Sequence, residues 1–259
     1  MTSRELPAAA LWDMDGTLID SEPYWIGAEM ALAERFGVTW TREDALSLVG
    51  RPLDVSAKIL QAAGIALPID AIVEDLLGQV TARARAHLPW MDDSRQLLEA
   101  LHNEGIPCAL VTMSRGDFVE TFLDAAGAMF DTVVTGDQVL HGKPDPEAYL
   151  LAARRLGVNP TDCVAIEDSA AGVRSAHASG ARTIGVIRHV DVPQLDGIAR
   201  VTSLAAVTVD DVRAFARGEM PHSLASRGAR VAEDGPNSGR GFDGVAVEGR
   251  GSAAKLGTQ

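Results

Sequence analysis

Two pairs of closely spaced carboxylates each follow a short apolar run in the sequence. Asp13 and Asp15 come after the first run, and Glu167 and Asp168 come after a later one. Taken alone, the first pair could form a strand-end turn with local hydrogen bonds, and the second could favour the start of a helix. If both pairs lie at one edge of a sheet, placing their negative charges close together is costly without a compensating cation. Mg²⁺ is such a cation, and it prefers oxygen ligands. The pattern therefore favours a site for a hard divalent cation.

An anion could bind beside these carboxylates through two other positions. Thr112 ends an apolar run, so its hydroxyl and the backbone N–H groups that follow, beginning at Met113, could face a bound anion. Lys143 is one of three lysines, against twenty arginines, and it precedes a proline in a loop. A flexible point charge suits a phosphate group next to two carboxylates. The alternatives are an ordinary strand-end threonine and a solvated loop lysine.

The elements that must position these residues are short β-branched apolar segments that alternate with helical patterns. The segments show no period-two alternation, as expected for strands covered on both faces of a parallel sheet. Helices begin at Asp93-Ser94 and at Pro144–Glu147, and they stop at Gly105 and Gly157. The alternation predicts a doubly wound, Rossmann-like α/β fold, in which ligands bind at the carboxyl ends of the strands. The predicted strands are Ala8–Asp13, Cys108–Thr112, Thr132–Thr135, Cys163–Glu167 and Thr183–Ile187.

A long helical interval separates the first predicted strand from the second. Apolar residues recur at helical spacing through it, and glycine or proline separates the segments. Such helices can form a small bundle of their own, so we expect an all-helical cap over 19–87, inserted into an α/β core of 1–18 and 88–218. Hinges at Leu18–Ser21 and Leu88–Asp92 would let the cap close over the site. The predicted cap helices are Glu22–Phe36, Arg42–Leu48, Asp54–Ala63 and Ile69–Ala86.

The composition changes near residue 218. From Glu219 to Gln259 the sequence is rich in glycine and poor in large apolar residues, so it has too little apolar surface to offset the entropy of ordering. We therefore expect a disordered tail over 219–259. Its five acids and five bases balance, so the net charge of −13 lies on residues 1–218.

The acidic character of the chain limits its partners. A net charge of −13 repels phosphate backbones, so we expect no nucleic-acid binding. No run approaches 18 apolar residues, which argues against a membrane span, and the N-terminus lacks the apolar centre of a secretory signal. Cys108 and Cys163 lie inside apolar runs, which fits a reducing compartment better than a disulfide framework. We therefore expect a cytoplasmic protein.

Four motifs occur in a fixed order at the predicted strand ends: Asp13-x-Asp15-Gly16-Thr17-Leu18, Thr112, Lys143-Pro144-Asp145-Pro146 and Ile166-Glu167-Asp168-Ser169. With a helical insert after the first motif, this arrangement resembles the haloacid dehalogenase-like hydrolase superfamily. In particular, it is similar to the β-phosphoglucomutase-like branch of phosphatases and mutases. The resemblance covers residues 8–190 and leaves the predicted tail outside.

The resemblance implies a phosphomonoesterase that acts on a small phosphorylated metabolite, such as a sugar or polyol phosphate. Asp13 would be the nucleophile that forms an aspartyl-phosphate, and Asp15 would be the general acid and base. Mg²⁺ would be held by the Asp13 carboxylate, the Asp15 backbone carbonyl and Asp168. Glu167 would ligate it directly or through water. The phosphoryl oxygens would be held by Thr112, Met113 and Lys143.

The cap is expected to choose the substrate and the reaction. Arg51, between Gly50 and Pro52 at a helix break, could bind a second phosphate or a sugar hydroxyl, or could be a solvated loop arginine. β-Phosphoglucomutases resemble this chain at the site but carry a His where Trp25 stands, and their Arg comes two residues later than Arg51. These departures favour hydrolysis; the alternative is a β-phosphoglucomutase-type isomerase that transfers phosphate within one sugar. We expect a monomer, because the cap must swing.

Overall fold

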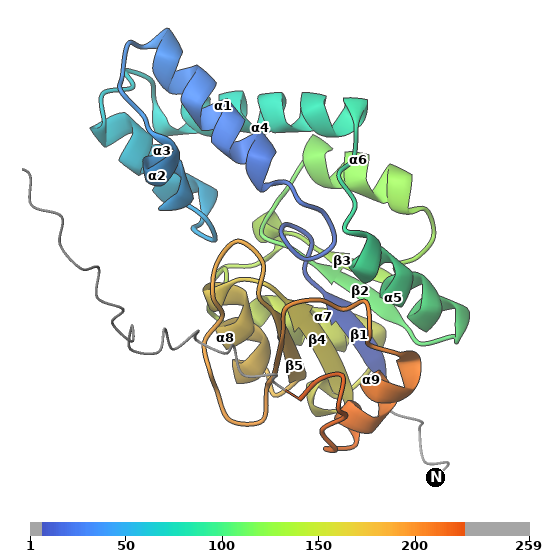
Figure 1. Ribbon diagram of the computed structural model, residues 1–259. Helices are drawn as coiled ribbons and strands as arrows, with labels where there is room; N and C mark the ends of the chain where they lie inside the picture. Colours follow the sequence, from blue (N-terminus) through green and yellow to red (C-terminus); the bar gives the residue numbers. More distant parts are fainter. Residues whose placement is uncertain (1–6, 226–259) are drawn as a thin grey trace, which may run out of the picture. The chain divides into compact units, whose positions relative to one another are not determined.

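Six short strands form one parallel sheet in the computed structural model, which describes residues 7–225 (Figure 1). The strand order is β3-β2-β1-β4-β5-β6, so β1 lies inside the sheet with β2 and β4 as its neighbours. The doubly wound α/β fold predicted from the sequence is confirmed. The strands are β1 (Ala9–Trp12), β2 (Cys108–Val111), β3 (Thr132–Val134), β4 (Cys163–Glu167), β5 (Arg182–Val186) and β6 (Ala199–Val201).

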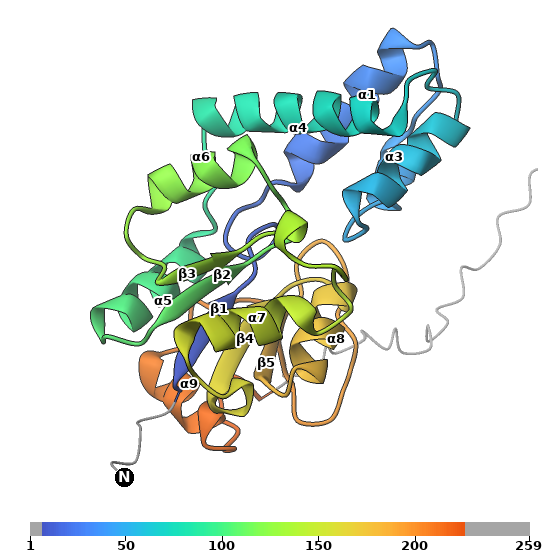
Figure 2. The same ribbon diagram turned by 180° about the vertical axis from the view of Figure 1, so that it is seen from behind.

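Five helices accompany the strands: α5 (Asp92–Asn103), α6 (Asp117–Ala126), α7 (Glu147–Leu156), α8 (Ala170–Ala178) and α9 (Val209–Ala216). Successive side chains of a strand point to opposite faces of the sheet. Accordingly, Ala10 and Trp12 of β1 pack into the core shared with α5 and α9, whereas Ala9 and Leu11 pack into the core under α7 and α8. Figure 2 shows α7 in front of the strands and α8 beside β5. Both faces of β1 are therefore buried, which explains its unbroken apolar sequence.

Four helices lie between β1 and α5 along the chain: α1 (Glu22–Arg35), α2 (Arg42–Leu46), α3 (Leu53–Ala62) and α4 (Ile69–Ala86). Helix α4 packs against α1, α3 and the core helix α6. The indole of Trp25 meets the ring of Phe118 edge to face, with ring centres 5.8 Å apart. The inserted helical cap is thus confirmed. Because residues 7–225 belong to one compact unit, the domain limits 1–18, 19–87 and 88–218 stay a prediction.

The two connections between core and cap lie side by side. Ile19 and Trp90 form an antiparallel bridge. The N–H of Met91 donates to the carbonyl of Leu18 at 2.9 Å, and the N–H of Asp20 donates to the carbonyl of Pro89 at 2.9 Å. The predicted hinge segments therefore pair with each other, and a movement of the cap would bend both together.

Each predicted element begins and ends within a few residues of an observed one. Helices α6 and α9 have no counterpart among the predicted helices, and β6 has none among the predicted strands. It is three residues long and has the half-buried Arg200 at its centre. An apolar pattern is too short to be recognised there.

The predicted tail falls mostly outside the described residues. Of the range 219–259, the structure describes 219–225, where the side chain of Leu224 is fully buried in the core. The range 226–259 lies outside the described residues. Within the described chain, no helix has both the length and the apolar character needed to cross a membrane.

Candidate active site

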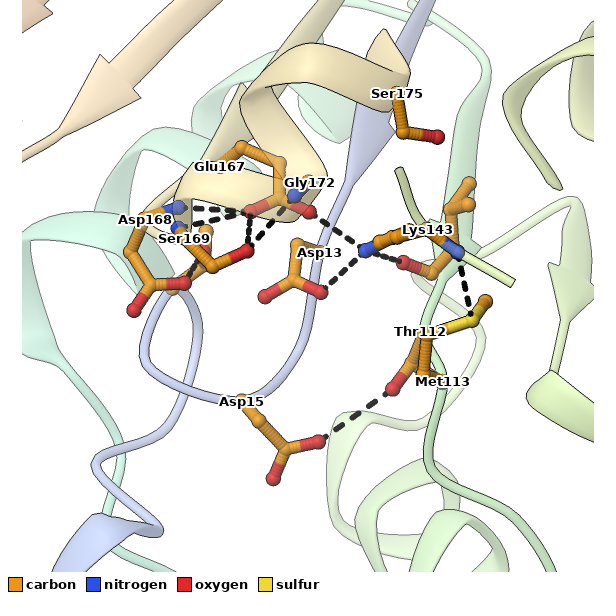
Figure 3. Close-up of polar contacts among 12 residues, drawn as sticks. Asp13, Asp15, Thr112, Met113, Lys143, Glu167, Asp168, Ser169, Gly172 and Ser175 are labelled. Carbon is orange, nitrogen blue, oxygen red and sulfur yellow. Dashed lines mark hydrogen bonds and ion pairs between the residues drawn. The ribbon is translucent and has the colours of Figure 1, made fainter. Parts of the chain in front are cut away.

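The carboxyl ends of β1, β2 and β4 meet at one edge of the sheet, and most of the predicted site residues gather there (Figure 3). Asp13 follows β1, Thr112 follows β2, and Asp168 follows Glu167 at the end of β4. Neighbouring strands of a parallel sheet run in one direction, so their ends lie side by side. Lys143 joins the cluster from the segment between β3 and α7.

The Lys143 ammonium lies at the centre of the cluster. Its Nζ donates to Asp13 Oδ1 at 2.6 Å, to Glu167 Oε1 at 2.6 Å and to the Val111 carbonyl at 2.8 Å. Burial disfavours the charged ammonium, but Asp13 and Glu167 outweigh this effect and raise the pKa of Lys143. Lys143 is therefore a buried, permanently charged cation and not a solvated loop lysine.

Glu167 is surrounded by hydrogen-bond donors. Its Oε1 accepts from Lys143 Nζ and from the Tyr149 hydroxyl at 3.1 Å. Its Oε2 accepts from the N–H of Asp168 at 3.0 Å and from the N–H and hydroxyl of Ser169, both at 3.1 Å. A carboxylate offers about four lone-pair positions. Direct metal ligation by Glu167 would therefore require it to give up one of these contacts.

The carboxylate oxygens of Asp13 and Asp168 accept fewer hydrogen bonds than those of Glu167. Asp13 Oδ2 is buried and has no hydrogen-bond partner within residues 7–225. Asp168 Oδ1 accepts from the Thr17 hydroxyl at 3.1 Å. Gly16, whose φ is +82°, lies so close that a Cβ there would be 2.0 Å from Asp168 Oδ2. The turn after β1 thus needs glycine both for its left-handed backbone and for this approach.

The electrostatics of the cluster fit a divalent cation. One oxygen from each of Asp13, Glu167 and Asp168 can be chosen so that all three lie within 4.8 Å of one another. Burial, followed by repulsion from Glu167, raises the pKa of Asp13 to about 7. Burial and repulsion from Asp13 raise the pKa of Asp168 well above its usual range. When ionised, three carboxylates and the one ammonium of Lys143 leave a net charge of −2, which Mg²⁺ would neutralise with the oxygen ligands it prefers.

The side chain of Asp15 lies outside this cluster of carboxylates. Its Oδ1 accepts from the Ser21 hydroxyl at 2.6 Å, and its Oδ2 accepts from the Ser114 hydroxyl at 2.7 Å. Thr112 Oγ1 lies 3.4 Å from the same Oδ2, as the dashed line in Figure 3 shows. Asp15 is thus held by hydroxyl groups next to Asp13, where a carboxyl group could exchange protons.

Thr112 and Met113 occupy the end of β2 in different ways. Thr112 is buried, and its Oγ1 accepts from the N–H of Ser114 at 3.0 Å. The Met113 side chain turns toward the Lys143 loop, where its Sδ accepts from the N–H of Lys143 at 3.4 Å. The Met113 side chain therefore supports Lys143, and the backbone is the part of Met113 that could face an anion.

Arg51 is not part of the cluster. Its side chain is exposed, and its Nε donates to the carbonyl of Ser47 at 2.8 Å within the cap. The turn that carries it is nevertheless close to the end of β4, because a Cβ on Gly50 would lie 3.6 Å from the Ser169 Cβ. Trp25 packs against Phe118 and so is a packing residue.

Several residues of the site were not among the predicted ones. Ser21 and Ser114 both contact Asp15, and each stands beside a motif or hinge that the sequence marks. Tyr149 carries no such signal, because it occupies an apolar position of helix α7. Gly172 in α8 allows the approach of Glu167, since a Cβ there would lie 1.6 Å from Oε1.

Known proteins are similar to this chain in sequence and in fold. The chain is 34% identical over 194 residues to the validoxylamine A 7'-phosphate phosphatase of Streptomyces hygroscopicus subsp. limoneus, covering 72% of this chain and 88% of that protein. It is 34% identical over 202 residues to hexitol phosphatase A of Escherichia coli, covering 77% and 92%. The crystal structure of CbbY from Rhodobacter sphaeroides in complex with phosphate superposes with a TM-score of 0.69 at 28% identity, covering 79% of this chain and 98% of that one.

The match to a whole family covers the sheet and the cap together. Residues 10–186 match the sequence profile of haloacid dehalogenase-like hydrolases. That range runs from β1 to the end of β5 and includes every strand end at which the carboxylates, Thr112 and Lys143 meet. With its fold, its strand-end residues and its relatives in agreement, the chain belongs to the haloacid dehalogenase-like hydrolase family.

Proposed function

We propose that this chain is a Mg²⁺-dependent phosphatase that hydrolyses small phosphorylated sugars or polyols through an aspartyl-phosphate on Asp13. The observation that carries the proposal is the buried contact of Lys143 with Asp13, whose other oxygen has no hydrogen-bond partner in the described chain. An ammonium next to a carboxylate with a spare oxygen suits attack on an anionic phosphoryl group. Two of the relatives are named as phosphatases, one of them for hexitols, which supports the substrate class.

In the first half of the reaction, Asp13 Oδ2 attacks phosphorus and forms an oxygen–phosphorus bond. The ester bond between phosphorus and the substrate oxygen breaks on the opposite side. Asp15, protonated at this stage, gives its proton to the leaving alkoxide, which departs as an alcohol. The products of this half are the aspartyl-phosphate and an ionised Asp15.

In the second half, a water molecule attacks the same phosphorus. Asp15 takes a proton from this water, and the bond between phosphorus and the Asp13 oxygen breaks. Inorganic phosphate leaves, the Asp13 carboxylate is restored, and Asp15 is again protonated. The hydroxyls of Ser21 and Ser114 keep Asp15 in place for both transfers.

Lys143, Thr112 and the Met113 backbone would bind the phosphoryl oxygens. Asp13 and Asp168 would hold Mg²⁺ with the Asp15 backbone carbonyl, and Glu167, whose oxygens already accept five hydrogen bonds, would act through water. When bound, Mg²⁺ would supply positive charge for the phosphoryl group.

Hydrolysis is favoured over intramolecular transfer by the first cap helix. Trp25 occupies the position at which the resemblance places a mutase histidine, and its ring packs on Phe118.

Arg51, on the cap turn next to Ser169, would contact a distal hydroxyl or anionic group of the substrate when the cap is closed.

The test is a hydrolysis screen across sugar, polyol and nucleoside monophosphates with purified protein and Mg²⁺. Release of inorganic phosphate from sugar or polyol phosphates, lost in Asp13→Asn, supports the proposal. With glucose 1-phosphate, appearance of glucose 6-phosphate in place of free phosphate would show a mutase instead. Hydrolysis confined to nucleotides would contradict the substrate class.

A further inference from the structure

Tyr149 reaches the proposed active site from helix α7 and not from a strand end. The side chain is fully buried and belongs to the apolar core that contains Ala9 and Leu11 of β1. Its hydroxyl donates to Glu167 Oε1 at 3.1 Å. Lys143 Nζ lies 5.2 Å from the centre of its ring, a distance at which an ammonium is attracted to an aromatic face. Tyr149 thus contacts both the cation and its carboxylate partner.

All the donors of Lys143 are in use before any substrate binds. An ammonium has three N–H groups, and those of Lys143 are given to Asp13, Glu167 and the Val111 carbonyl. To bind a phosphoryl oxygen, Lys143 must exchange one of these contacts. The contact with Asp13 is the one that the reaction itself disturbs, so the other two must hold the ammonium during the reaction.

Tyr149 governs one of those two remaining contacts. Glu167 Oε1 accepts from both Tyr149 and Lys143, so the two donors share the charge of one oxygen. Without the phenol, this oxygen would interact with Lys143 alone and would draw the ammonium away from the phosphoryl group. Burial, and then the charge of Glu167, raise the pKa of Tyr149 well above its usual value, so the phenol stays a donor.

We propose that Tyr149 is a positioning residue: through its hydrogen bond to Glu167 Oε1 it sets the place of the Lys143 ammonium and thereby the affinity of the site for phosphate. This inference rests on the proposed function and adds to it a residue buried below the site. It distinguishes Tyr149 from the rest of the α7 core, which acts through packing alone.

The test compares Tyr149→Phe with the unaltered protein in the presence of saturating Mg²⁺. Phenylalanine keeps the ring and removes one oxygen atom. The inhibition constant for inorganic phosphate is expected to rise about tenfold, the loss expected for a hydrogen bond to a charged group. The midpoint of Mg²⁺ activation is expected to stay within about twofold, because Glu167 would reach the metal only through water, while the proposed direct ligands, Asp13 and Asp168, keep their own hydrogen bonds.

Ser179→Ala is the matched control. Ser179 is also buried and donates its hydroxyl hydrogen bond to the Ala176 carbonyl at 2.6 Å, at the far end of α8 from Glu167. It is expected to lower thermal stability while leaving phosphate inhibition unchanged. If Tyr149→Phe behaves in the same way, with phosphate inhibition within twofold of the unaltered protein, the inference is wrong and the proposed function is unaffected. If the unaltered protein neither hydrolyses phosphate esters nor is inhibited by phosphate, the proposed function itself fails.

A second measurement does not depend on the folding of the variant. The chain has two tyrosines, Tyr24 and Tyr149, so replacement by 3-fluorotyrosine gives two fluorine resonances that Tyr24→Phe assigns. Addition of inorganic phosphate with Mg²⁺ is expected to shift the Tyr149 resonance and leave that of Tyr24 in place. An unmoved Tyr149 resonance at saturating phosphate would overturn the inference.

Discussion

The hydroxyl of Ser21 lies 2.6 Å from Asp15 Oδ1, although Ser21 directly precedes helix α1. At that position a serine oxygen ordinarily accepts hydrogen bonds from the first turn of its helix. In the described structure Ser21 makes no such side-chain bond, and its side chain is fully buried. Ser114 donates to the other oxygen of Asp15 at 2.7 Å. Asp15 is therefore held by one hydroxyl from the cap connection and one from the core.

This arrangement predicts a leaving-group-dependent defect in Ser21→Ala. Without the Ser21 hydroxyl, Asp15 is less well placed to protonate the departing alkoxide. We expect the single-turnover rate of phosphoryl transfer from an alkyl phosphate to fall by about tenfold, within the range that proton transfer contributes to catalysis. For 4-nitrophenyl phosphate, whose leaving group needs no proton, the same rate should change by less than about twofold. Single-turnover measurements of alcohol and 4-nitrophenolate release isolate this first half of the reaction, because Asp15 also serves the second half with either substrate.

Ser47→Ala serves as the control for this prediction. Ser47 also lies in the cap, and its hydroxyl donates to the carbonyl of Asp44 at 2.6 Å, in an exposed position. Both substrates should be hydrolysed at the unaltered rate. An equal loss of the single-turnover transfer rate for the alkyl and aryl phosphates in Ser21→Ala would show that the hydroxyl does not act through Asp15 on the leaving group.

Asp13→Asn should separate activity from stability. The amide cannot form the aspartyl-phosphate, so we expect activity to fall by roughly a thousandfold or more. The metal-free protein should nevertheless be more stable at pH 8, because burial and Glu167 raise the pKa of Asp13 to about 7 and an ionised Asp13 is unfavourable there. Activity assays and thermal melts in EDTA test both parts. A variant that keeps most of its activity would refute the role of Asp13 as nucleophile.

Mg²⁺ should raise the melting temperature as well as the activity. A ligand that binds only the folded state stabilises it, by about 2.7 kcal/mol at a hundredfold excess over Kd. We expect EDTA to abolish activity, Mg²⁺ to restore it, and melts to shift upward with Mg²⁺ concentration. In Asp168→Asn the shift should be much smaller. Full activity after thorough chelation would rule out a metal at the Asp13, Glu167 and Asp168 cluster.

The meeting of Asp13, Glu167 and Asp168 could be predicted because their motifs follow apolar segments, and that of Lys143 because its loop motif occurs in a fixed order with theirs. Segments without polar alternation imply a parallel sheet, and parallel strands bring their carboxyl ends together. The motifs thus indicated both the chemical groups of the site and the edge of the sheet at which they meet. The charge balance of the cluster, three carboxylates around one ammonium, is a consequence of this topology.

The polar contacts that Tyr149 and Ser21 make with the site residues could not be predicted from the sequence. Tyr149 stands among apolar residues of α7, and only the packing of that helix directs its hydroxyl to Glu167. Ser21 precedes α1, where its type indicates a helix cap and its observed partner is Asp15. A side chain with two possible local roles needs the three-dimensional structure to decide between them.

Glu29 makes the stability of the chain depend on pH, independently of any metal. This side chain of α1 is buried, and Trp40 Nε1 lies 3.4 Å from its Oε2. Burial raises the pKa of Glu29 from 4.5 to about 7, against the opposing effect of the Trp40 hydrogen bond. The folded state therefore holds this proton more tightly than the unfolded state. Its contribution to the free energy of unfolding falls as the pH rises from 4.5 to about 7 and is constant above that.

Glu29→Gln should remove this dependence. The difference in free energy of unfolding between Glu29→Gln and the unaltered protein should shift in favour of the variant by on the order of 2 kcal/mol when the pH is raised from 4 to 8. Urea unfolding at both pH values, in EDTA, measures it. Glu34→Gln on the same helix, where the side chain is exposed, should give no such gain. Equal behaviour of the two variants would mean that Glu29 is not the group that titrates.

Gly16→Ala and Gly37→Ala test whether the turn after β1 needs glycine for its backbone alone. Both glycines have positive φ, +82° and +68°, so alanine should cost each a similar amount, roughly 1 kcal/mol. A Cβ at position 37 would meet no atom of the described chain within 4 Å, whereas one at position 16 would lie 2.0 Å from Asp168 Oδ2. Only Gly16→Ala should therefore displace Asp168. We expect it to weaken Mg²⁺ activation by about tenfold or more, a loss consistent with disturbing a metal ligand, while Gly37→Ala keeps the unaltered Mg²⁺ midpoint. If the two variants lose only stability and to the same extent, the Asp168 carboxylate beside this turn does not hold the metal.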